Sequence, residues 1–192
     1  FVEHLDANVG RVLAQVKKLK LDKNTIIIFT SDNGGALGYG ASNQPLSGGK
    51  GDMFEGGIRI PCIVKVPKQS KSIITSSPLL LMDFYPTLQK LAGGSLNNKL
   101  PSKLIAPIFN STVQDKRYMI WVRREGHKFG GRAYYAISDG RYKLLQRNPF
   151  SKYELFDLEN DSKETQPLNL PKIKKTLMKI LTKHIQDSGK IR

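Results

Sequence analysis

The sequence has a single cysteine and no apolar stretch long enough to cross a membrane. Cys62 has no second thiol among the 192 residues, which excludes an internal disulfide framework. It lies in the apolar segment "RIPCIVKV", which predicts a buried structural thiol. Apolar runs stay well short of the roughly 18 residues that a membrane-spanning helix needs. A hydrophobic content of 39% instead indicates a globular protein of one large domain, or of one domain and a smaller unit.

Acidic residues are also scarce. The chain has 31 Lys and Arg against 16 Asp and Glu, a formal net charge of +15. The first 60 residues hold 7 basic and 6 acidic residues, so the remaining 24 and 10 place the excess after residue 60. The basic residues form no run of five or six, and no zinc-finger, RRM or KH signature is present. This distribution favours a lysine-rich solvated surface and leaves a polyanion-binding module open as the alternative.

Hydrophobic periodicity predicts an α/β unit in the first half of the chain. Residues 1–20 place apolar side chains at spacings of three and four, which indicates an amphipathic helix. Residues 25–30 are β-branched and apolar on both faces, which predicts a buried parallel strand. Residues 58–67 predict a second strand, and Asp83 and Gly93 are suited to begin and end a second helix. Helix, buried strand and polar glycine-rich loop in this order are typical of the α/β class.

The pattern changes after a turn-rich segment at residues 95–112. Beyond it come short strand-like segments separated by turn signals, and "SDG" at 138–140 suits a tight hairpin turn. Residues 173–185 place apolar side chains on one helical face. We therefore expect one unit over residues 1–110 and a small antiparallel sheet with a covering helix over residues 111–192.

The glycine-rich loop after the first predicted strand has the strongest candidate site. Asp32 and Asn33 stand where that strand ends, the place where open α/β sheets bind ligands. A carboxylate beside an amide offers hard oxygen donors that suit Ca²⁺ or Mg²⁺, although Asp-Asn-Gly is also ordinary turn chemistry. Lys50 lies among glycines, where its ammonium is suited to neutralise sulfate or phosphate. Glu55 and Arg59 are four residues apart, which favours a structural ion pair over a catalytic role.

Five blocks resemble, in order, the C-terminal portion of a sulfatase. They are "TIIIFTSDNG", "PLSGGKGDMFEGGIRIPCIVKVP", "LMDFYPTLQKLAG", "SDGRYKLL" and "YELFDLENDSKET". The chain is most similar to the arylsulfatases, within the alkaline-phosphatase-like superfamily. The resemblance implies part of the mixed or parallel α/β sheet of that superfamily with flanking helices, followed by a small antiparallel sheet covered by a helix.

The resemblance also implies site residues. Asp32 and Asn33 match the acid and amide that complete a calcium site, and Lys50 matches a lysine that contacts the sulfate group. The family's nucleophile is a formylglycine made from the first residue of a C/S-x-P-S-R motif. Its hydrate attacks sulfur, and sulfate is then expelled to regenerate the aldehyde. Superfamily phosphatases with two transition metals commonly have histidine beside this aspartate, so Asn33 favours one calcium ion and a sulfate ester.

The chain departs from the family in lacking the nucleophile. No C/S-x-P-S-R motif is present, and Cys62 is followed by "IVKV". The opening "FVEHLDANVGRVL" is typical of the middle of a helix, so we expect a piece of a longer protein, with the nucleophile upstream and no sulfatase activity in the isolated chain. His127 lies either in a surface loop, the favoured reading, or in a substrate cleft. His4 and His184 are expected at the surface.

The resemblance implies a sulfuric ester hydrolase that acts on a sulfate ester such as a sulfated glycan, in a secreted, periplasmic or lysosomal compartment. No specific nucleic acid partner is expected. A phosphatase or phosphodiesterase of the same superfamily and the polyanion-binding module are the alternatives. Specificity among sulfate esters is expected to come from loops around the site.

Overall fold

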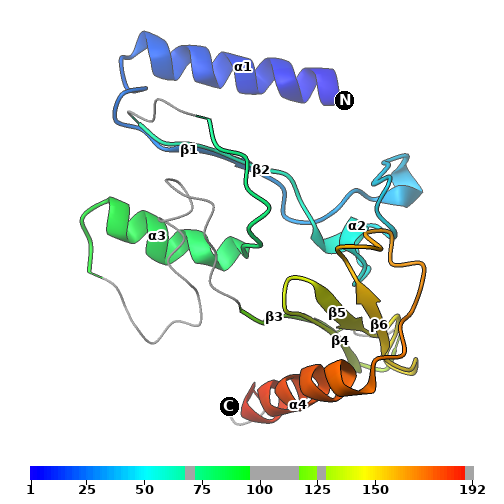
Figure 1. Cartoon of the computed structure of the whole chain (residues 1–192). Coiled ribbons are helices and arrows are strands. Elements are labelled where there is room, and N and C mark those ends of the chain that lie inside the picture. Colours follow the sequence, from blue (N-terminus) through cyan, green and yellow to red (C-terminus); the bar gives the residue numbers. More distant parts are fainter. Residues whose placement is uncertain (68–71, 96–116, 125–128, 189–192) are drawn as a thin grey trace.

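The computed structural model describes residues 1–67, 72–95, 117–124 and 129–188 (Figure 1). The elements are, in chain order, α1 (Val2–Lys18), β1 (Ile27–Thr30), the 3₁₀ turn η1 (Leu37–Tyr39), α2 (Glu55–Ile58), β2 (Cys62–Lys65), the 3₁₀ turn η2 (Leu81–Asp83), α3 (Phe84–Leu91), β3 (Met119–Arg124), β4 (Ala133–Ser138), β5 (Tyr142–Leu145), β6 (Glu154–Asp157) and α4 (Pro171–Ser188). The predicted α/β class is confirmed. Of the helices in these ranges, none combines the length and the apolar character that a bilayer span requires.

The first strand pairs differently from the prediction. β1 and β2 form a two-stranded antiparallel sheet in which Ile27 is opposite Lys65 and Thr30 is opposite Cys62. No residue of β1 is buried, so the expectation of a buried parallel strand at 25–30 is wrong for this chain. A short apolar β-branched run has the same pattern in either setting, because its partner strand decides the pairing. Cys62 is exposed, which also corrects the expectation of a buried thiol.

The helix predicted to begin near Asp83 is α3. Its N-cap, Asp83, is fully buried, but its carboxylate does not cap the helix. The Oδ2 atom instead accepts hydrogen bonds from the Leu80 amide at 2.8 Å and from the Arg117 guanidinium at 2.7 Å. Because Arg117 precedes β3, this buried ion pair fastens α3 to the start of the second sheet.

The second half forms the predicted antiparallel sheet, with strand order β3-β4-β5-β6. The hairpin predicted at "SDG" joins β4 to β5, and each strand pairs antiparallel with its neighbour. One face of the sheet is covered by α4, as expected, and Figure 1 shows the helix along that side. The residues of this apolar layer are Ile137, Leu144 and Leu155 from the sheet and Leu177 and Leu181 from α4, each at most 1% exposed.

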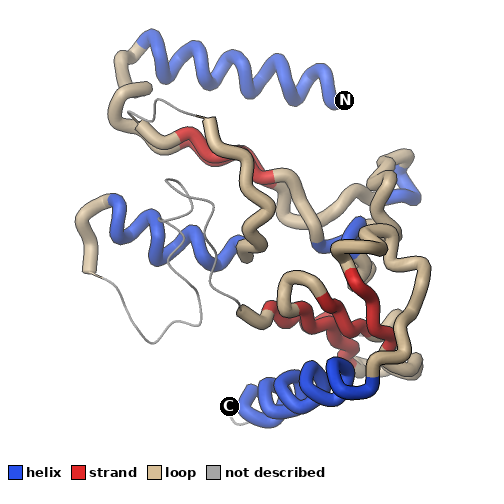
Figure 2. Tube along the Cα trace, in the orientation of Figure 1, coloured by secondary structure: helices blue, strands red, loops and turns tan. Residues whose placement is uncertain are grey.

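The opposite face of the sheet packs against the glycine-rich loop. Met53, just before α2, joins an apolar cluster whose other members lie on the sheet: Tyr134, Ala136, Leu145 and Phe156. Figure 2 shows the short α2 helix and its loop beside this sheet, with α4 on the far side. The sheet thus lies between the loop that holds Asp32 and Asn33 and the terminal helix.

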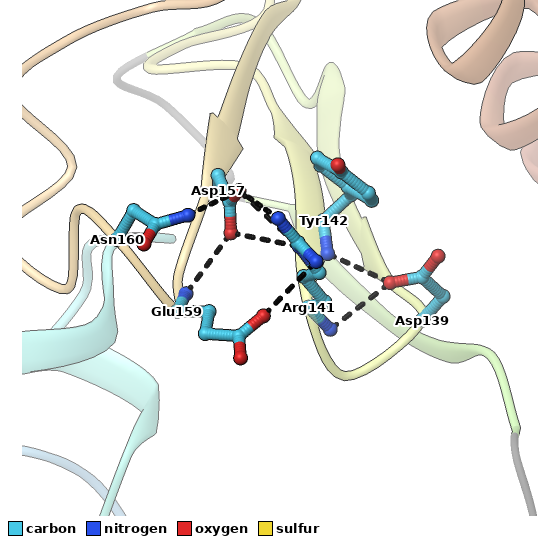
Figure 3. Close-up of polar contacts among 6 residues, drawn as sticks. All are labelled: Asp139, Arg141, Tyr142, Asp157, Glu159 and Asn160. Carbon is cyan, nitrogen blue, oxygen red and sulfur yellow. Dashed lines mark hydrogen bonds and ion pairs between the residues drawn. The ribbon is translucent and has the colours of Figure 1, made fainter.

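A polar network closes the β4–β5 turn against the end of β6 (Figure 3). Asp139 accepts hydrogen bonds from the Arg141 and Tyr142 amides at 3.0 and 2.7 Å, which shapes the turn. The Arg141 guanidinium then reaches Asp157 at 2.8 Å and Glu159 at 3.1 Å. The hydrogen bonds from Arg141 lower the pKa of the Asp157 carboxyl. A charge-assisted contact of this kind holds the ends of three strands in register.

Candidate functional site

A pocket of about 260 Å³ opens beyond the end of β1. Three segments that are distant in sequence form its wall: the turn after β1, the loop and helix at 51–58, and strand β3. The lining residues are Asp32, Asn33, Gly51, Asp52, Met53, Gly57, Ile58, Trp121, Val122 and Arg123. Asp32 and Asn33, the pair predicted from sequence, are therefore brought together with a strand about ninety residues away.

The backbone after β1 presents the Asp32 carboxylate to solvent. The Ser31 hydroxyl donates to the Asn33 carbonyl at 2.9 Å, and the Asn33 amide donates to the Gly34 carbonyl at 2.8 Å. Asp32 is exposed, and among the described residues its carboxylate takes part in no hydrogen bond or ion pair. Its oxygens are therefore available to a ligand, with the half-buried Asn33 beside them.

The glycine pairs pack backbone against backbone. A Cβ added to Gly34 would lie 1.8 Å from the Gly56 carbonyl oxygen, one on Gly56 2.3 Å from that of Gly48, and one on Gly57 2.4 Å from that of Asp52. The Gly34 amide donates to the Gly57 carbonyl at 2.9 Å. The glycines thus allow the turn after β1 to dock on α2, because any side chain would separate the two segments.

The Asn43 side chain makes three hydrogen bonds within the glycine-rich loop, a role that was not predicted from the sequence. Its Oδ1 accepts from the Gly35 amide at 2.8 Å, and its Nδ2 donates to the carbonyls of Gly35 and Gly48, both at 3.0 Å. One side chain thereby satisfies both backbone groups of Gly35 and joins two of the three glycine pairs between residues 34 and 57, namely 34–35 and 48–49. The only sequence signal is an asparagine within a long glycine-rich loop, which also fits an ordinary turn.

Lys50 stands next to the pocket without lining it. Its backbone amide donates to the Gly35 carbonyl at 2.9 Å, so the residue is fixed in the loop. The side chain is exposed, and it is Gly51, the next residue, that reaches the pocket wall. The contact between Lys50 and a sulfate group stays a prediction.

A buried ion cluster holds this loop on the sheet. Lys143 of β5 is fully buried, and its ammonium lies 2.9 Å from Glu55 of α2 and 2.8 Å from Glu164. Glu164 also accepts the Glu55 amide at 2.6 Å, which occupies the first turn of α2. Burial raises the pKa of the Glu164 carboxyl, and the nearby Lys143 charge opposes that rise. The predicted ion pair with Arg59 is present at 4.0 Å, but Glu55 is held mainly by Lys143, which sequence reasoning missed.

Strand β3 supplies the far wall of the pocket. Trp121 and Arg123 are two residues apart and so lie on one face of the strand. Trp121 packs against the apolar cluster that includes Met53. The Arg123 guanidinium lies over Gly51, where an added Cβ would be only 2.0 Å from Nη1. The charged and aromatic character of this wall was not predicted, because nothing local in "MIWVRR" indicates what the strand faces.

The oxygen donors at the pocket fit part of a calcium site. The Asp32 carboxylate and the Asn33 amide are hard ligands, and Ca²⁺ takes six to eight of them. Within the described ranges, no group of three or more His, Cys, Asp and Glu side chains is placed to hold a metal. His4 on α1 and His184 on α4 are exposed and do not line the pocket, and His127 lies outside the described residues. Two donors fit the ion in kind but do not complete its shell.

Comparison with known proteins identifies the family. The family model described as "Sulfatase" matches residues 1–95, and the one described as "N-sulphoglucosamine sulphohydrolase, C-terminal" matches residues 49–190. A "Sulfatase" from Formosa agariphila is 36% identical over 88% of this chain and 34% of its own length. "Arylsulfatase A" from Bos taurus is 32% identical over 85% of this chain and 37% of its own.

Solved structures agree with the sequence relatives. The crystal structure of Ps i-CgsB in complex with k-i-k-neocarrahexaose is 30% identical, with a TM-score of 0.79 over 95% of this chain and 40% of that protein. The chain thus spans between a third and two fifths of the length of these relatives. The second family model alone covers about three quarters of the chain, and both models name sulfatases. The chain therefore belongs to the sulfatase family and matches the C-terminal part of its members.

Proposed function

We propose that this chain supplies the Asp32–Asn33 half of a calcium-dependent, arylsulfatase-like site for the hydrolysis of sulfate esters. The observation that carries the proposal is the exposed Asp32 carboxylate, which has no partner among the described residues and stands beside Asn33 at a pocket. In a member of the sulfatase family, two hard oxygen donors at this position support a divalent-cation site.

Each residue has a defined task in the proposed site. Asp32 and Asn33 would hold Ca²⁺, which when bound supplies electrophilic stabilisation of sulfate oxygens. The Lys50 ammonium would neutralise negative charge on the same sulfate group from the neighbouring loop. The nucleophile would be a formylglycine encoded upstream, since this sequence has no C/S-x-P-S-R motif. The isolated chain would bind and orient without turnover.

We further propose a sulfated glycan as the substrate class. A related protein of known structure was crystallised with k-i-k-neocarrahexaose, an oligosaccharide by its name, and the pocket here has an aromatic and a cationic residue on its β3 wall. Trp121 offers an apolar face to a sugar ring, and Arg123 offers charge to an anionic group. Sulfatases of this kind would act in a secreted, periplasmic or lysosomal compartment.

Terbium luminescence tests the calcium site directly. Tb³⁺ replaces Ca²⁺ at oxygen sites and emits when a nearby tryptophan is excited. Trp121, the single tryptophan of the chain, lines the same pocket as Asp32 and Asn33. We expect sensitised emission that Ca²⁺ displaces, that D32N removes, and that the matched control D6N on the exposed face of α1 leaves intact.

Three outcomes would contradict the proposal. Equal emission from D32N and the unsubstituted chain would show that the ion binds elsewhere. Stoichiometric binding of zinc in place of calcium would favour a superfamily phosphatase or phosphodiesterase over a sulfatase. Turnover of an aryl sulfate by the isolated chain with calcium present would contradict the upstream position of the nucleophile.

A further inference from the structure

Helix α4 carries a row of lysines on the side that faces away from the sheet. Lys172, Lys175, Lys179 and Lys183 are separated by three, four and four residues, which places them in one line along the helix; we call them the lysine stripe. Leu177 and Leu181, buried on the sheet, lie on the other side. At a rise of about 1.5 Å per residue the stripe is about 16 Å long.

No ion pair includes a lysine of the stripe within the described part of the chain. All four side chains belong to exposed residues, and none of the ion pairs among described residues includes them. The remaining lysine of α4, Lys174, is not part of the stripe and donates to the Tyr153 carbonyl at 2.8 Å. The stripe is therefore a concentrated part of the +15 net charge.

The arrangement is unfavourable for an isolated helix. Lys175, Lys179 and Lys183 repel one another at spacings of four residues. Lys172 and Lys174 stand in the first turn, which has no acidic residue, so the positive end of the helix dipole faces positive charge. A bound polyanion would relieve both effects.

A second pocket, of about 250 Å³, lies at the start of the stripe. Lys172 and Thr176 line it together with Tyr118 and Tyr142. Asp139, the one carboxylate in its wall, already accepts two backbone hydrogen bonds through Oδ1. Tyrosine rings beside an ammonium and a hydroxyl suit the apolar face and the anionic groups of a sugar.

We propose that the lysine stripe and this pocket bind a sulfated polysaccharide on the face of the sheet opposite the Asp32 pocket. The choice of a sulfated glycan among polyanions rests on the proposed function, whereas the anionic character of the ligand rests on the stripe alone. The site would hold a polymeric substrate while the distant pocket acts on another part of it. Affinity would depend steeply on salt, because each neutralised charge releases counterions.

Heparin, used as a sulfated probe, tests the proposal with two variants of equal charge. The stripe variant is K172Q/K175Q/K179Q/K183Q, and the control is K17Q/K18Q/K20Q/K23Q at the end of α1. With a coefficient of roughly 0.7 per neutralised charge, as for single-stranded nucleic acid, the loss of four contacts should reduce the magnitude of the slope of log affinity against log salt by about 3. Between 50 and 200 mM salt, the affinity of the unsubstituted chain should therefore fall about 50-fold more than that of the stripe variant. In the control variant, the change in this slope should be less than about a fifth of the change in the stripe variant.

A footprint on the unsubstituted chain avoids any effect of substitution on folding. Bound heparin should protect Lys175, Lys179 and Lys183 from acetylation while Lys17 and Lys18 react at their free rates. Equal loss of affinity in both variants, or equal protection of all lysines, would show that net charge alone attracts the probe and would overturn the site. Double-stranded DNA of matched charge that binds as tightly through the stripe would overturn the choice of a glycan.

The two proposals fail separately. D32N should abolish terbium emission and leave heparin affinity unchanged, whereas the stripe variant should lose heparin affinity and retain the terbium signal. Loss of heparin binding in the stripe variant without any terbium site would keep the polyanion site and remove the calcium proposal.

Discussion

Replacement of the buried Lys143 by methionine should destabilise the chain strongly. Methionine matches the length of the lysine stem, so the main loss is the ammonium between Glu55 and Glu164 at 2.9 and 2.8 Å. Glu164 is 2% exposed and Glu55 9%, so K143M removes the cation beside Glu164 and leaves Glu55 with Arg59 at 4.0 Å. Removal of one partner of a buried ion pair costs about 3–5 kcal/mol. That loss is a large share of the roughly 5–15 kcal/mol that stabilises a domain.

The penalty of K143M should also depend on pH. Burial already raises the pKa of Glu164 above its ordinary value of 4.5, and loss of Lys143 removes the charge that opposes this rise. A carboxyl group whose pKa is higher in the folded than in the unfolded state makes its full contribution to stability at pH values below the unfolded-state pKa. This contribution is lost as the pH rises through the folded-state pKa. Urea unfolding followed by circular dichroism should therefore show a larger loss at about pH 7 than at about pH 4.5.

Two variants separate the ion cluster from general effects of substitution. K143M/E164Q removes one of the stranded charges and should recover part of the loss. K152M, at an exposed lysine, should change the free energy of unfolding by at most about 0.5 kcal/mol. A loss below about 1 kcal/mol for K143M with no dependence on pH would mean that water reaches Glu55 and Glu164, and that the glycine-rich loop is not docked on the sheet as described.

Three further predictions concern single sites. G34A should destabilise by about 1–3 kcal/mol in urea unfolding, because its Cβ would meet the Gly56 carbonyl at 1.8 Å; an unchanged midpoint would contradict the close packing. D157N should lower the unfolding midpoint near pH 7, and the difference should vanish as the pH falls through the depressed pKa of Asp157, below 3.8; a constant difference would exclude the Arg141 interaction as its cause. A thiol reagent should add once per chain, at Cys62, and the pH midpoint of its reaction rate should lie above that of free cysteine, because neighbouring atoms partly desolvate the sulfur of this exposed residue and raise the thiol pKa; a lower midpoint would contradict this.

The two long helices and the β4–β5 hairpin could be predicted because the sequence patterns that indicate them are local. The apolar spacing of residues 1–20 and 173–185 corresponds to α1 and α4, and "SDG" marks the hairpin between β4 and β5. Each of these patterns depends on neighbours within a few residues, so the chain itself contains the information. The pairing of β1 and the exposure of Cys62 were not predictable in this way, since both depend on which segment lies alongside the strand.

The candidate site shows the same division. Asp32, Asn33 and Lys50 were predicted from residue type, from their position in the glycine-rich loop and from the sulfatase resemblance, and the structure places a pocket at Asp32 and Asn33. Their roles stay a prediction. The β3 wall with Trp121 and Arg123 was missed, because the strand comes from a part of the chain with no motif that names its neighbour.

The sequence by itself determined the sulfatase likeness, the helices and the hairpin, the acid–amide pair at the strand end and the excess of positive charge. The tertiary structure alone decided that Lys143 meets Glu55 across 88 residues and that Glu164 meets Glu55 across 109. It also decided that one side of α4 is left as a row of lysines that form no ion pair with any described residue. The physical reason is that helix and turn propensities act over a few residues, whereas burial of a charge depends on which surfaces the folded chain brings together.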